Sequence, residues 1–142
     1  MEPITRQSIL DLLNSDWAEY VARFQNLSPE AQAVFLERQG YKRLADLLAH
    51  IAAWWEVGLQ AIQRFHADPS ARPLEIDIDS FNARAVEQVR SVSESDVIRS
   101  FEVARLKFTR EVQGLPESDF TDERVLEQMR WELINHLEDH RI

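Results

Sequence analysis

Three of the four histidines in this 142-residue sequence have positions that suit metal coordination. His136 and His140 are four residues apart, so in a helix both imidazole rings would project from one face, one turn apart. At that spacing two rings can bind one cation. The alternative is a pair of surface histidines near a C-terminal helix end, where the helix dipole favours them.

His50 favours the metal interpretation. It follows Leu47 by three residues and precedes Trp54 by four, which in a helix places it at the inner edge of an apolar face. If that helix lies beside the last one, the three rings would supply three nitrogen ligands and leave coordination positions for water or substrate, as in catalytic metal sites. The alternative is a core histidine hydrogen-bonded to a carbonyl or a carboxylate.

Three carboxylates near the histidines are candidates for orienting the rings from behind. Asp46 precedes His50 by four residues, Glu132 precedes His136 by four, and Asp139 follows His136 by three. In an acidic protein, solvated positions on exposed helix edges are an equal alternative for each of them. The sequence shows no residue that stands out as a general acid or base.

Glycine and proline divide the chain into long helical segments. Ser28 and Pro29 are typical of a helix start and Gly40 of a helix end, which predicts a short extra helix near 29–36. A capping pattern at 93–96 predicts a kink or break near 91–93. The four long helices are predicted at about 4–27, 42–67, 81–113 and 121–142, with a long crossover loop near 68–79.

Length and composition predict one domain over residues 1–142, with a single hydrophobic core. Apolar residues make up 44% of the chain and charged residues 29%, which is ordinary for a globular protein. Since no sheet is predicted, the helices must bury their apolar faces on each other. The predicted fold class is all-α: an up-and-down four-helix bundle with the short extra helix and the long loop.

Composition also excludes several kinds of site and partner. The chain has no cysteine, which rules out disulfides, thiolate metal sites and a cysteine nucleophile. The residue after His136 is Leu137 rather than the glutamate of a zincin helix, and no Gly-x-Ser-x-Gly or phosphate-binding glycine loop occurs. The net charge of −9 disfavours nucleic acid as a partner. Without a leader or membrane-spanning pattern, a cytoplasmic protein is expected.

The sequence resembles the DinB-like superfamily, and within it the ClbS/DfsB-type four-helix proteins. The resemblance is carried by YKRLADLLAHIAAWWE at 41–56 and NHLEDH at 135–140, with SFNAR at 80–84 and LPESDF at 115–120, so it covers nearly the whole chain. It implies a bundle that is often a homodimer, with a divalent metal held by His50 of the second long helix and by His136 and His140 of the last. Relatives act as thiol-dependent transferases, isomerases or a hydrolase.

These observations lead to two hypotheses about function. The first is a metal-dependent enzyme, a hydrolase or thiol-dependent transferase, that acts on a small electrophilic molecule. Its cofactor would be a divalent metal ion such as zinc, nickel, iron or manganese. The second is a non-catalytic helical bundle that binds a small molecule or acts through its dimer surface. Family resemblance names neither substrate nor reaction.

Overall fold

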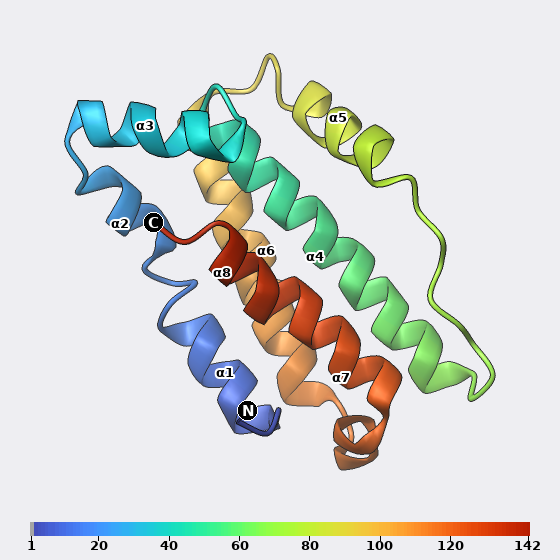
Figure 1. Cartoon of the computed structure of the whole chain (residues 1–142). Helices are drawn as coiled ribbons and strands as arrows, with labels where there is room; N and C mark the ends of the chain where they lie inside the picture. The colour runs from blue at the N-terminus through green and yellow to red at the C-terminus, as the bar shows by residue number, and fades with distance from the viewer. Residues whose placement is uncertain (1) are drawn as a thin grey trace.

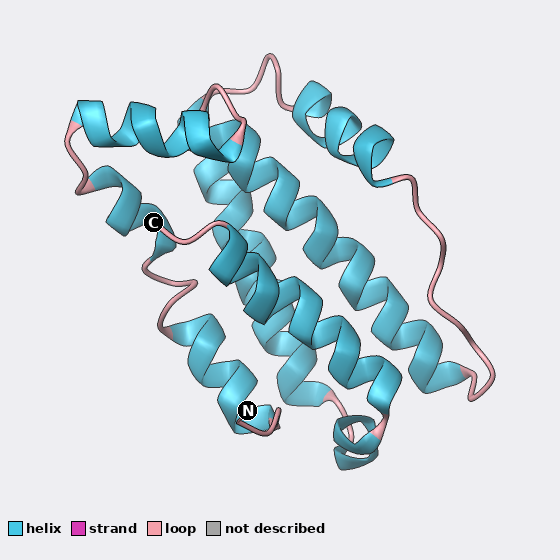
Figure 2. Ribbon diagram, in the orientation of Figure 1, coloured by secondary structure: helices cyan, strands magenta, loops and turns pink. Residues whose placement is uncertain are grey.

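Helices make up the regular secondary structure of the computed structural model, which describes residues 2–142, and no strand occurs in that range (Figure 2). The all-α prediction is therefore confirmed. In chain order the elements are α1 (Arg6–Asn14), α2 (Tyr20–Gln25), α3 (Pro29–Gln39), α4 (Leu44–Ala67), α5 (Ile78–Gln88), α6 (Glu94–Gly114), η1 (Glu117–Thr121), α7 (Glu123–Met129), η2 (Arg130–Asn135) and α8 (His136–Asp139).

Helix α4 is the centre of the arrangement, since it packs against α5, α6 and α7. Figure 1 shows α1, α4, α6 and the continuous segment α7–η2–α8 running side by side, while α3 crosses one end and α5 flanks α4 on the outside. Helix α1 packs against α6. Among residues 2–142, no helix combines the length and the hydropathy that a membrane span requires.

Helix α4 is 24 residues long and agrees with its predicted range to within two residues. Its N-cap, Arg43, makes no side-chain capping bond. Instead, the Glu94 carboxylate at the start of α6 accepts a hydrogen bond of 3.2 Å from the Ala45 amide. One free amide of the helix N-terminus is thereby paired, and the starts of α4 and α6 are joined.

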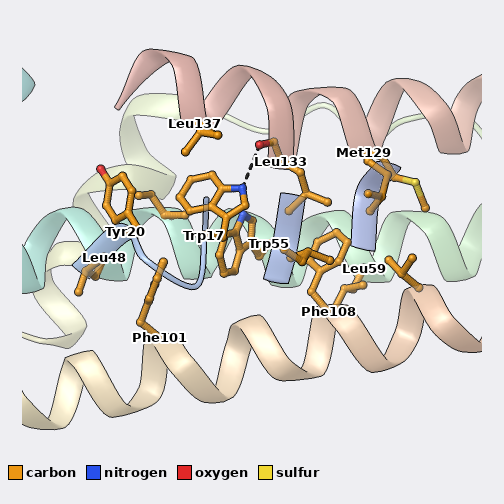
Figure 3. Packing of buried hydrophobic residues seen from close by; sticks show 14 of the residues in the cluster. Trp17, Tyr20, Leu48, Trp55, Leu59, Phe101, Phe108, Met129, Leu133 and Leu137 are labelled. Carbon is orange, nitrogen blue, oxygen red and sulfur yellow. Dashed lines mark hydrogen bonds between the residues drawn. The ribbon is translucent and has the colours of Figure 1, made fainter. Parts of the chain in front are cut away.

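An aromatic cluster fills the core between these helices (Figure 3). The Trp17 and Trp55 rings meet edge to face, with centroids 4.9 Å apart. Both indole nitrogens are buried and both donate to main-chain carbonyls of η2: Trp17 to Leu133 at 3.0 Å and Trp55 to Glu132 at 2.9 Å. The two tryptophans therefore fix the last segment of the chain against α1 and α4 as well as filling space.

The prediction of one continuous helix over 4–27 is wrong, because turns at residues 15–19 separate α1 from α2. The Ser15 hydroxyl bonds back to the Asp11 carbonyl at 2.6 Å, and polar residues of this kind compete with the helical hydrogen bonds. The break lets Trp17 turn fully into the core. No glycine or proline marks the break, so the apolar periodicity predicted a helix that continued through it.

The other predicted boundaries are close to the observed ones. Helix α3 begins after the Ser28 N-cap as predicted, but it runs to Gln39 and ends at Gly40, whose φ of 81° is left-handed. The break near 91–93 is confirmed, with Ser93 capping α6. The loop is two residues shorter than predicted, because the Asp77 side chain caps α5 by accepting from the Ser80 amide.

The last segment differs from the continuous helix predicted for 121–142. Its helical part ends at Asp139, and η2 is a π-helical segment. The His136 amide donates to Trp131, five residues back, rather than to Glu132. The Glu132 carbonyl is thereby free to accept the indole N–H of Trp55. This local widening lies directly before the two C-terminal histidines.

Candidate metal centre

The structure brings the three histidines together. His50 lies on α4, His136 begins α8, and His140 follows the last residue of α8. One ring nitrogen from each lies within 4.8 Å of the others, and the Nε2 atoms of His50 and His140 are 3.2 Å apart. The predicted proximity of the middle helix and the last helix is therefore observed.

The hydrogen bonds around His50 determine which of its nitrogens carries the proton. Its Nδ1 lies 2.9 Å from Oδ1 of Asn82 on α5, and the same oxygen accepts the indole N–H of Trp54 at 2.7 Å. Indole N–H groups only donate, so the Asn82 atom must be the amide oxygen. His50 then donates from Nδ1, and its Nε2 presents a lone pair.

His140 is held in the same way from the other side. Its Nδ1 lies 2.7 Å from Oε1 of Gln39, the last residue of α3; with the amide oxygen toward the ring, His140 donates from Nδ1 and its Nε2 is the acceptor. The Tyr20 hydroxyl donates to the His140 carbonyl at 2.5 Å and fixes the backbone beyond α8. Side chains from α2 and α3 thus position a ring that lies outside regular helix.

Two lone pairs that face each other at 3.2 Å repel unless a cation or a shared proton lies between them. Nitrogen ligands about 2.0–2.1 Å from a tetrahedral zinc ion are about 3.3 Å apart, so this pair already has the separation that coordination requires. The third ring lies close enough to complete a set of three after a small movement.

His136 contributes a nitrogen that the folded chain does not satisfy. Its Nδ1 is buried and has no hydrogen-bond partner among residues 2–142. The Glu132 carbonyl lies near the ring without a well-aligned bond to it, and it accepts the indole N–H of Trp55. An unpaired buried imidazole nitrogen costs free energy.

All three rings are neutral at pH 7. Burial, followed by the unfavourable interaction with protonated His50 and His140, lowers the pKa of His136 to about 3. Burial, followed by the charge of His50, lowers the pKa of His140 to about 4, and burial also lowers the pKa of His50. Because only the neutral ring binds metal, the cluster offers its lone pairs without first losing protons.

The three carboxylates predicted to orient the rings bond elsewhere or remain free in the described structure. Asp46 is buried and pairs with Arg43 at 3.0 Å, and Glu132 points toward Gly58 and Gln128. Asp139 is exposed and acts on His140 only through its charge. No hydrogen bond between these carboxylates and the histidines occurs within residues 2–142.

The amides that orient the rings, Asn82 and Gln39, were missed by the sequence interpretation. They are separated from their histidines by 32 and 101 residues, so no local spacing could indicate the pairing. Asn82 lies within the 80–84 stretch that supported the family resemblance. That stretch was the only signal that could have identified it.

A cavity of about 610 Å³ adjoins the cluster. It runs between α4, the loop before α5 and the α7–η2 segment, with His50 and His136 at one end and Arg64 near the other. Trp54 and Trp131 contribute to its wall. The volume suits a small organic molecule. The full lining is His50, Trp54, Val57, Gln60, Ala61, Arg64, Pro73, Leu74, Ile76, Ile78, Asn82, Gln128, Trp131, Glu132, Asn135, His136 and Asp139.

The donor set fits a divalent ion of borderline softness, because imidazole suits zinc, copper, iron and nickel. Such an ion would lie at the end of the cavity, where a ligand could reach it. No family model, curated protein or solved structure matches the chain.

Proposed function

We propose that this protein is a metal-dependent enzyme of the DinB-like type, with His50, His136 and His140 as ligands of one divalent cation. The observation that carries the proposal is the pair of acceptor nitrogens of His50 and His140, 3.2 Å apart, with a third imidazole within 4.8 Å. The rigid amide partners of two rings support it, since metal-ligating histidines usually donate their other N–H to a fixed acceptor.

The proposed fold is a four-helix bundle of the ClbS/DfsB type. It departs from the predicted up-and-down order, because α4 and α6 begin at the same end and run parallel, with the loop and α5 as the crossover between them (Figure 1). Its four long elements would be α1 with α2, α4, α6, and α7 with η2 and α8. The packing of α4 on α6 and α7, and of α1 on α6, supports this assignment. A homodimer is proposed from the family resemblance alone, and the molar mass of the protein in solution would test it.

The proposed reaction class is hydrolysis or thiol transfer on a small electrophilic molecule. A bound divalent cation would supply a Lewis acid that lowers the pKa of water or of a small thiol. The chain itself would contribute the fixed orientation of the rings by Asn82 and Gln39, and a largely apolar cavity that holds the electrophile beside them.

Metal analysis of protein purified without a histidine tag tests the proposal. We expect one equivalent of metal, and after its removal a rise in thermal stability on adding zinc, nickel or manganese. The gain is about 2.7 kcal/mol when free metal is about 100 times Kd. His50→Ala and His136→Ala should lose the bound metal and the stabilisation by added metal. His66 lies outside the cluster and pairs with Asp119, so His66→Ala should keep both properties.

Two outcomes would reject this function. One is wild-type protein that neither contains metal nor gains stability from it, which would favour the non-catalytic small-molecule-binding or dimerising protein. The other is metal binding that survives in His136→Ala and His50→Ala, which would place the metal elsewhere.

Substitution of Asn82 should change the metal affinity although none of the three metal-binding histidines is altered. Asn82→Leu removes the acceptor that fixes the His50 ring, and we expect metal affinity to fall about 10- to 100-fold. Asn82→Asp keeps an acceptor oxygen at the same place and should retain or increase affinity. Calorimetric titration with zinc gives the comparison, and equal affinities for the two variants would contradict the orienting role.

A further inference from the structure

The Glu132 carboxyl is buried in the wall of the cavity without a countercharge. Its residue is only 3% exposed, and among residues 2–142 no charged partner of its carboxylate occurs. Its one side-chain hydrogen bond comes from Gln128 Nε2 at a long 3.4 Å. A buried carboxyl with so few partners is costly to ionise.

The structure makes room for this carboxyl at Gly58. A Cβ atom at position 58 would lie 2.6 Å from both Cγ and Oε2 of Glu132, closer than real Cβ contacts allow. Any larger residue there would force the carboxyl to move. Gly58 therefore allows the Glu132 carboxyl to lie against α4.

The surroundings of Glu132 in the cavity are mostly apolar. Trp54, Val57, Leu74 and Trp131 line the wall, and Leu74 and Trp131 are exposed large hydrophobic residues. Apart from the histidines, Arg64 is the one basic residue in the lining. Its guanidinium donates to the Arg72 carbonyl rather than to Glu132. A second acid, Asp139, also lines the cavity and is exposed.

We propose that this cavity binds an apolar amine whose ammonium group is held by the Glu132 carboxylate and whose apolar body lies against Trp54 and Trp131. Such a ligand supplies the missing countercharge together with N–H donors, and aromatic faces also attract a cation. Gly58 follows His50 by eight residues, about 12 Å along α4, whereas Glu132 precedes His136 by four, about 6 Å along the last segment, so the ammonium would lie in the same cavity as the histidines. The proposal goes beyond the metal site and does not depend on it.

Electrostatics support a cationic rather than a neutral or anionic ligand. Burial raises the pKa of Glu132 to about 8, which reflects the cost of an ionised carboxylate that lacks a cation. An ammonium would remove that cost, whereas an alcohol would not and a carboxylate would increase it. The net charge of −9 also attracts cations at long range, which favours a cationic ligand.

The test compares three compounds that share an indole body: tryptamine, the alcohol tryptophol and the acid indolepropionate. Calorimetry at pH 9, where the Glu132 carboxyl is ionised and an aliphatic amine is still protonated, uses full-length protein freed of metal by a chelator, so that the outcome is independent of the histidine site. We expect tryptamine to bind at least about tenfold more tightly than tryptophol, the usual gain from a charge-assisted hydrogen bond, and indolepropionate not to bind.

Three variants connect that preference to Glu132. Glu132→Gln should bind tryptophol as the wild type does and lose the preference for tryptamine, which also shows that the cavity remains folded. Gly58→Ala should weaken tryptamine binding by displacing the carboxyl. Glu138→Gln removes the same charge at an exposed position that does not line the cavity, and should change nothing.

Any of three results would overturn the inference: equal binding of amine and alcohol to the wild type, a preference for the amine that survives in Glu132→Gln, or no binding of tryptamine at millimolar concentration. The protein can fail to bind metal and still prefer tryptamine, and it can bind metal without that preference. The two proposals are therefore judged separately.

Discussion

The free energy of unfolding of the metal-free protein is expected to reach a maximum near pH 6.5 and to fall on both sides. The acid side reflects the histidines, whose pKa values are lowered in the folded protein to about 3 for His136 and about 4 for His140 from 6.5 in the unfolded chain. Below pH 6.5 the unfolded chain binds protons that the folded chain does not, so stability is lost down to about pH 3. The loss from these two groups is on the order of 8 kcal/mol.

The fall in stability on the alkaline side reflects Glu132, whose pKa is raised by folding instead of lowered. Its pKa rises from 4.5 in the unfolded chain to about 8 in the folded protein, so the folded state binds more protons between these values. Stability from this group is complete below about pH 4.5 and is lost as pH rises toward 8, by on the order of 5 kcal/mol in total, of which about 2 kcal/mol is lost above pH 6.5. Between pH 4.5 and 6.5 the unfolded chain takes up more protons on the three histidines than the folded chain keeps on Glu132, so stability rises with pH. Above pH 6.5 only the Glu132 contribution remains, and stability falls.

Urea denaturation across this pH range, in the presence of a chelator, measures the profile. Glu132→Gln should remove the decline above pH 6.5, and His136→Leu should make the acid side less steep. A profile that is flat between pH 5 and 8 in the wild type, or a decline above pH 6.5 that persists in Glu132→Gln, would contradict the assignment of the two sides.

Trp17→Ala should be among the most destabilising single substitutions in this protein. The indole is 1% exposed, packs edge to face on Trp55 and donates to the Leu133 carbonyl at 3.0 Å. Its removal leaves a large cavity and deletes the buried hydrogen bond to the Leu133 carbonyl, at a cost of about 3–5 kcal/mol. That is a large share of the roughly 5–15 kcal/mol typical of a whole domain.

Trp131→Ala is the matched control for this prediction, because it deletes the same side chain at a position that is 48% exposed. Its cost should stay below about 1 kcal/mol. Urea midpoints of the two variants and the wild type give the comparison. Similar losses for both would show that Trp17 does not hold η2 against α1 as described. Trp17→Phe should lose less than Trp17→Ala, since it keeps part of the packing.

The helical class, the four long apolar segments and most boundaries followed from the sequence, because they depend on local preferences. The Ser28 and Ser93 caps and Gly40 act within one turn of the chain, and apolar periodicity indicates helix at any position. The same local logic failed at 15–19, where the helix breaks so that a single tryptophan can enter the core. The Ser15 hydroxyl permits the break locally, but the packing of distant residues around Trp17 favours it.

The candidate site divides in the same way. The spacing of His136 and His140, and the position of His50 beside an apolar stripe, were sufficient to propose three ligands. The tautomers, the lone pairs facing each other at 3.2 Å and the unpaired nitrogen of His136 depend on contacts with α3 and α5, across 32 to 101 residues of chain. Sequence spacing carries no information about such contacts.

The sequence by itself determined which residues form helices and which side chains are able to bind metal, because both depend on residue type and near neighbours. Only the tertiary structure decided which nitrogen of each ring faces its partners, that Asn82 and Gln39 rather than the nearby carboxylates hold the rings, and that Glu132 lies buried against Gly58. These features arise where separate helices meet, and their geometry follows from the packing of the whole core.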